Sequence, residues 1–160
     1  MATQTLAAAT RAFPVSIYSD DVPIPYPSTP MVGVVTGFGA DRLTAAESNF
    51  SSLKAGDIIY NTSGGVADIV VGVNTSTQIL LAGYSGGGFA IGDSFSIYPG
   101  NRNEGCTLYV CGAGDVEVET VGGDIVTFLG VAGAHEPQLI PVQVLKVRAA
   151  TSATFIIALW

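Results

Sequence analysis

The feature that most constrains this chain is a strict alternation of apolar and acidic residues in its C-terminal third. The segment 116–119 reads VEVE, the pair Gly122-Gly123 follows, and Val126 and Phe128 continue the apolar phase. A period of two places one face of an extended strand on a core and the other in water. The pattern therefore predicts an antiparallel hairpin that is half buried and turns at Gly122-Gly123.

The C-terminal end of the chain breaks this alternation. Residues 153–160 read ATFIIALW, which puts apolar side chains on both faces of any strand drawn there. Such a strand has to be covered on one side by its own core and on the other by something else. We therefore expect this end to take part in assembly.

The composition favours an all-β fold with many turns. Hydrophobic residues make up 48% of the 160 residues, charged residues only 12%, and there are 20 glycines, whereas average domains are about 25% charged and about 7% glycine. The polar stretch PGNRNEG at 99–105 divides the sequence. We predict two small antiparallel β modules, at 31–99 (barrel-like) and 105–160 (sandwich-like), preceded by an extended proline-rich arm at 1–30.

Within this plan the local patterns predict individual elements. A short helix is expected at Thr5–Ala12 and one helical turn at Asp41–Ser48. A β-bulge is expected near Leu145, where the apolar phase shifts, and Pro141 predicts a free strand edge. In the first module, short β-rich runs predict strands at Met31–Thr36, Asp57–Asn61, Val66–Val73, Gln78–Ala82 and Phe95–Tyr98.

Four Gly-Asp pairs each stand before an apolar run, which favours turns, because glycine adopts positive φ and aspartate bonds nearby backbone. They lack the alternating oxygen ligands of a calcium loop. Cys106 and Cys111 would lie roughly 16 Å apart on opposite faces of a straight strand at ~3.3 Å per residue. We interpret them as small buried apolar residues rather than as a disulfide, redox or metal pair. The four pairs are Gly56-Asp57, Gly92-Asp93, Gly114-Asp115 and Gly123-Asp124.

Charge and motifs argue against several classes of function. The net charge is −7 and the sequence has no stripe of Lys and Arg residues, so we expect no nucleic-acid binding. No apolar run reaches the ~20 residues that span a bilayer, so we expect no membrane-spanning helix. The segment 83–87 (GYSGG) matches a nucleophile elbow, but a third glycine and a β-like run follow instead of a helix. The single histidine, His135, is read as a solvated loop residue. We expect no enzymatic activity, cofactor, metal or secretory signal.

Two stretches resemble known families. The segment from Gly105, with GDVEVET, GGDIVTFLGV, VQVLKVRA and TSATFIIALW, is similar to the small β-domain of bacteriophage spike-base proteins. The segment 34–98, with LKAGDIIYNTSGGVADIVVGVNTSTQILLA and FAIGDSFSIYP, resembles a β-module of phage virion structural proteins. These resemblances imply a component of a tailed-phage virion, made in the cytoplasm of the bacterial host.

The leading hypothesis is a capsid decoration, or cement, protein that binds the major capsid protein and copies of itself. The alternative is a tail or baseplate structural protein, the spike base; a glycan-binding module is a third possibility. An arm that crosses several subunits would add avidity. The residues expected at assembly interfaces are Phe13, Ile17, Tyr18, Pro23, Pro25 and Tyr26 on the arm, and Phe155, Ile157 and Trp160 at the C-terminal end.

Overall fold

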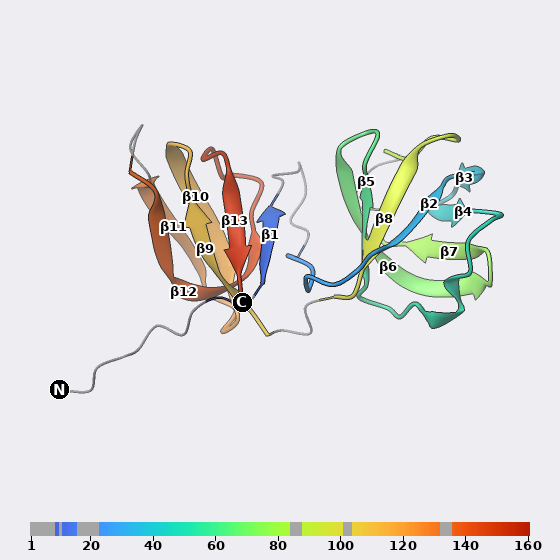
Figure 1. Cartoon of the computed structure of the whole chain (residues 1–160), viewed down its shortest axis with the longest axis horizontal. Helices are drawn as coiled ribbons and strands as arrows, with labels where there is room; N and C mark the ends of the chain where they lie inside the picture. The colour runs from blue at the N-terminus through green and yellow to red at the C-terminus, as the bar shows by residue number, and fades with distance from the viewer. Residues whose placement is uncertain (1–8, 10, 16–22, 84–87, 101–103, 132–135) are drawn as a thin grey trace.

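Two antiparallel sheets make up the described part of the chain (Figure 1). The computed structural model describes residue 9 and residues 11–15, 23–83, 88–100, 104–131 and 136–160. Neither sheet closes into a barrel. The predicted all-β class, with two antiparallel β modules, is confirmed.

The first sheet is formed by strands from the first half of the chain, in the order β2-β8-β5-β6-β7-β4-β3. Its core contains Leu43, Phe50, Ile59 and Phe95, all almost completely buried. A short 3₁₀ helix, Phe50–Ser52, brings Phe50 into this core. The strands are β2 (Met31–Val34), β3 (Gly37–Gly39), β4 (Arg42–Thr44), β5 (Ile58–Asn61), β6 (Val66–Thr75), β7 (Gln78–Leu81) and β8 (Ser94–Tyr98).

The prediction of a helical turn at Asp41–Ser48 is wrong, because a tight hairpin occupies this segment. Strands β3 and β4 pair with Gly39 opposite Arg42, and the two loop residues Ala40 and Asp41 have φ of 48° and 58°. Two consecutive positive φ values are those of a type I′ turn, whose twist matches that of the strands. Burial of Leu43 in the core outweighs the weak local preference for helix.

The second sheet has the order β1-β13-β9-β12-β10-β11. The hairpin predicted from the VEVE pattern is present, with Val116 and Val118 fully buried and their neighbouring glutamates on the outer face. Its turn includes Gly122 and Gly123. The strands are β1 (Ala12–Val15), β9 (Cys106–Val110), β10 (Gly114–Thr120), β11 (Ile125–Val131), β12 (Gln138–Val147) and β13 (Ile156–Leu159).

The predicted bulge at Leu145 is also present. Glu119 lies opposite Lys146 and Thr120 opposite Val144, so Leu145 is the extra residue of β12. Strand β12 is internal, yet its ladders to β9 and β10 both leave out Pro141. The proline therefore costs no ladder hydrogen bond, which agrees with the free edge expected at this point.

Three of the four Gly-Asp pairs lie at turns as predicted, whereas Gly114 and Asp115 belong to strand β10. Gly56 and Gly92 have φ of 94° and 96°, a conformation that side chains disfavour. One carboxylate oxygen of Asp57 accepts the N–H of Lys54 at 2.8 Å, and Asp93 accepts the N–H of Ala90 at the same distance. These carboxylates therefore accept hydrogen bonds from backbone N–H groups of their own turns.

The N-terminal arm contributes a strand to the second sheet. Ala12 pairs with Leu159 and Val15 with Ile156, so β1 lies at the edge of that sheet beside β13 (Figure 1). Most of the expected helix, Thr5–Ala12, lies outside the described residues, and Ala12 begins a strand. Farther along, Ile24 enters the core of the second module.

Candidate assembly surfaces

The arm joins the two modules through an aromatic cluster. The ring of Phe13 in β1 lies 6.0 Å from that of Tyr60 and 5.1 Å from that of Tyr98, which belong to the outer face of the first sheet. The two tyrosine rings lie 5.9 Å apart, nearly perpendicular to each other. Edge-to-face packing of this kind is favourable for aromatic pairs. Phe13 thus packs on the first module while its backbone pairs in the second.

The rest of the described arm is held by backbone contacts to its own chain. Pro23 forms a β-bridge with Lys146, and the N–H of Ile24 donates to the carbonyl of Leu145 at 2.9 Å. The N–H of Tyr26 donates to the carbonyl of Pro99 at 3.0 Å. The bulge at Leu145 is therefore the point where the second module holds the arm.

Side chains add to this attachment close to the C-terminal strand. The ring of Tyr26 lies 6.3 Å from that of Trp160, and the Arg11 guanidinium lies 5.5 Å from the centre of the Tyr26 ring. Arg11 and Trp160 also exchange two backbone hydrogen bonds, of 3.0 and 3.2 Å. Arm and C-terminal strand thus form one unit.

An open groove of about 700 Å³ runs between the arm and the first sheet. Neither a carboxylate nor a histidine is among its described lining residues. Its aromatic rings pack on one another rather than presenting flat platforms. The lining consists of Arg11, Ala12, Phe13, Pro14, Pro27, Ser28, Thr29, Pro30, Tyr60, Thr62, Ser96 and Tyr98.

The outer face of β13 carries an apolar row that crosses four strands. Pro14 lies opposite Ile157, Ile157 opposite Tyr109, and Tyr109 opposite Leu139. Residues in register on neighbouring strands share a face of the sheet. The inner face of β13 is buried through Ile156 and Ala158. The expectation of apolar groups on both faces of this strand is therefore met.

Phe155 directly precedes β13 at one end of this row. Its side chain is 80% exposed, and its φ is 52°, a left-handed conformation that costs a non-glycine residue about 1–2 kcal/mol. Its carbonyl accepts the N–H of Cys111 at 3.0 Å, which holds the backbone in place. We call Pro14, Tyr109, Leu139, Phe155 and Ile157 the β13 face.

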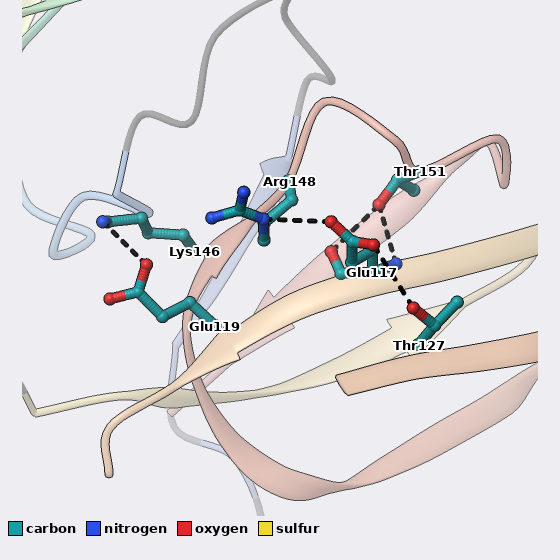
Figure 2. A network of polar contacts seen from close by, with 6 residues as sticks. All are labelled: Glu117, Glu119, Thr127, Lys146, Arg148 and Thr151. Atoms are coloured by element: carbon teal, nitrogen blue, oxygen red, sulfur yellow. Dashed lines mark hydrogen bonds and ion pairs between the residues drawn. The ribbon is translucent and has the colours of Figure 1, made fainter. Parts of the chain in front are cut away.

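A polar network covers the outer face of the hairpin at the other side of the sheet (Figure 2). Arg148 Nε lies 3.0 Å from Glu117 Oε1, and Lys146 Nζ lies 2.8 Å from Glu119 Oε2. The hydroxyl of Thr127 donates to Glu117 Oε2 at 3.3 Å. These ion pairs are about three-quarters buried, so they are less screened by salt than fully exposed pairs.

The structure places the predicted assembly residues in two different environments. Phe13, Pro23 and Tyr26 contact their own chain, and Pro25 is buried. Phe155 and Ile157 lie on the β13 face, whereas Trp160 packs beside Tyr26 and is only half-buried. Ile17 and Tyr18 lie outside the described residues. The expectation that the arm rests on another chain therefore differs from what its described residues do.

The sequence did not predict three members of the β13 face, Pro14, Tyr109 and Leu139. No local pattern brings them together, because their strands are far apart in the chain. The order β1-β13-β9-β12 is what aligns them. Only a prediction of strand pairing could have found this surface.

The described residues hold no group of three His, Cys, Asp or Glu side chains that could bind a metal. Cys106 is buried and its thiol donates to the carbonyl of Val144 at 3.4 Å, and burial raises its pKa to about 12. Such a thiol is unreactive. Ser85 and His135 lie outside the described residues. No helix in the described ranges is long and apolar enough to cross a membrane.

No protein-family model, curated protein or solved structure matches this chain.

Proposed function

We propose that this chain is a structural protein of a tailed-phage virion, a decoration protein that binds the major capsid protein on the head shell. The proposal builds on the resemblance of residues 34–98 and 105–160 to phage virion modules. Its partners are the shell and further copies of the chain, and its place is the virion, after synthesis in the host bacterium. It needs neither a cofactor nor a catalytic residue.

The observation that carries this proposal is the conformation of Phe155. A large apolar side chain that is 80% exposed gains nothing from the fold, and its φ of 52° costs free energy. Strained and exposed residues of this kind cluster at sites of binding. Phe155 is the anchor that we expect to enter a pocket on the shell, because aromatic anchors dominate the energetics of interfaces.

The β13 face as a whole suits such a contact. Its five residues, Pro14, Tyr109, Leu139, Phe155 and Ile157, carry no charge, although the chain has a net charge of −7. Depletion of charge is typical of the centre of a protein interface. Many copies on a repetitive shell would then add up to a large total stabilisation even if each contact is weak.

The test compares Phe155→Ala with Ile91→Ala for attachment to purified capsids that lack the protein. Both side chains are highly exposed, at 80% and 74%, but they belong to different modules. We expect Phe155→Ala to weaken attachment by at least tenfold, since an aromatic anchor contributes about 2 kcal/mol or more. Ile91→Ala should bind like the wild type.

Equal binding by the two variants would contradict the role of Phe155. Deletion of residues 1–30 is a less specific test, because it removes β1 from the sheet and Ile24 from the core. Counting copies per virion distinguishes a shell protein from the alternative, a tail or baseplate protein. Hundreds of copies agree with a shell protein, whereas a handful would assign the chain to the tail or baseplate.

A further inference from the structure

Strand β11 forms an unusually open edge of the second sheet. Among the described residues it pairs with β10 alone, and it lies on the side of that sheet away from the first module (Figure 1). Its seven residues, IVTFLGV, include neither charge nor proline. The other three edges are blunted, since β1 contains Pro14, β2 has four residues and β3 has three.

The backbone of β11 offers hydrogen-bonding groups to this edge. The N–H of Arg148, which follows β12, donates to the carbonyl of Glu117 at 2.8 Å, so Glu117 and Thr127 form a non-hydrogen-bonded pair between β10 and β11. Hydrogen-bonded and non-hydrogen-bonded pairs alternate along an antiparallel ladder. Ile125 and Thr127, which lie opposite Glu119 and Glu117, therefore direct their N–H and C=O groups away from β10.

The same residues present apolar side chains on the outer face. Ile125 is 58% exposed and Leu129 is 77% exposed, two residues on either side of Thr127. Beyond Phe128 the register shifts, because β11 has one residue more than β10 between Phe128 and Val131. A bulge of this kind bends a strand. The straight part of the edge is thus Ile125–Phe128, and Leu129 follows it directly, two residues after Thr127.

We infer that β11 pairs antiparallel with β11 of a second copy, about a two-fold axis at Thr127. This register places Ile125 opposite the partner's Leu129 and Leu129 opposite the partner's Ile125. Both are apolar cross-strand pairs that stabilise a sheet. The sequence of the edge is complementary to itself, as a two-fold interface requires. The second sheets of the two copies would then form one continuous sheet.

Charge also favours a second copy at this edge. Two chains of net charge −7 repel each other, but β11 carries no charge. Of the three acidic residues of the neighbouring strand β10, Glu117 and Glu119 pair with Arg148 and Lys146 at 3.0 and 2.8 Å (Figure 2), and Asp115 accepts the N–H of Gly130 at 2.7 Å. These internal ion pairs lower the repulsion where the copies meet. The inference concerns the isolated chain and does not depend on the proposed attachment to a shell.

Sedimentation velocity of the purified full chain tests this inference through charge substitutions. The wild type should reach twice the 16.4 kDa mass of the chain as its concentration rises. Ile125→Glu combined with Leu129→Glu should abolish the dimer, because like charges face each other. Ile125→Glu combined with Leu129→Lys should restore it, because each glutamate then faces a lysine. Val32→Glu with Val34→Glu, the same change on the β2 edge, should leave the dimer intact.

A wild type that stays at the single-chain mass would overturn the inference, as would a trimer or a dimer that survives the double glutamate change. Cysteine cross-linking decides the register if those variants unfold. In a Cys111→Ser background, Thr127→Cys should form an intermolecular disulfide, since paired Cα atoms lie about 5.5 Å apart. Ile125→Cys should not, because the two copies of residue 125 lie roughly 13 Å apart at ~3.4 Å per residue. Equal cross-linking at both positions contradicts the two-fold axis at Thr127.

Discussion

The ring of Phe13 meets that of Tyr98 edge to face at 5.1 Å, although the backbone of Phe13 belongs to the sheet of the other module. A single side chain thus connects the two halves of the molecule. Its strand is fixed by β13, and its ring is fixed by β5 and β8. The junction therefore depends on a residue that the sequence analysis assigned to an interface with other chains.

Phe13→Ala should lower the free energy of unfolding by about 2 kcal/mol, because the half-buried ring loses its contacts with Tyr60 and Tyr98. Urea unfolding measures this change. Phe155→Ala removes an equally large side chain that is 80% exposed, and its effect should stay within about 0.5 kcal/mol. Similar losses in the two variants would show that Phe13 does not support the junction.

Phe155→Gly should be more stable than Phe155→Ala by about 1 kcal/mol, since glycine adopts the φ of 52° without steric cost. Both variants lack the ring, so the comparison isolates the backbone. Thermal unfolding of the two proteins is the measurement. A glycine variant no more stable than the alanine variant would mean that the backbone at this position is relaxed.

The raised pKa of Cys106, about 12 against an ordinary value of 9.0, makes stability depend on alkaline pH. Above pH 9 the unfolded chain loses the thiol proton while the folded chain keeps it, so the free energy of unfolding falls, by up to about 1.4 kcal/mol per pH unit. Urea unfolding below and above pH 9 should show a shallower fall for Cys106→Ala than for Cys111→Ala. The same fall in both would contradict burial of the thiol as the cause.

Deletion of Leu145 should release the arm from the second module. The carbonyl of Leu145 accepts the N–H of Ile24 because the bulge takes this residue out of the ladder with β10. Without the extra residue the N–H of Ile24 loses this acceptor, and its hydrogen exchange should become much faster. Deletion of Ala149, in the turn that follows β12, is the control. Unchanged protection of Ile24 in the Leu145 deletion would exclude the bulge as the anchor.

Local periodicity predicted much of the second module. The hairpin around Gly122-Gly123 and the bulge at Leu145 both follow from the phase of the apolar residues, which is set by burial on one face of a sheet. The hairpin at Ala40 and Asp41 escaped prediction, because its turn lacks the Asn-Gly or Asp-Gly signal. Its conformation is imposed by the packing of Leu43 instead.

The surfaces were less predictable than the strands. Phe155 and Ile157 were expected from the apolar run at the C-terminal end, but Tyr109 and Leu139 join them only through pairing between strands distant in the chain. The arm shows the same limit. Its prolines predicted extended backbone, yet nothing local indicated that Ala12–Val15 would become the edge of a sheet.

The pairing of β1 with β13 has a consequence for the order in which the chain folds. Residues 31–98, which supply all strands of the first sheet, leave the ribosome long before Ile156–Leu159. The first sheet can therefore form during synthesis, whereas Ala12–Val15 must wait for a partner more than a hundred residues away. Closing so long a loop is slow compared with forming a hairpin. One of the first strands to be synthesised is thus among the last to be placed, and Phe13 brings the two modules together only at that final step.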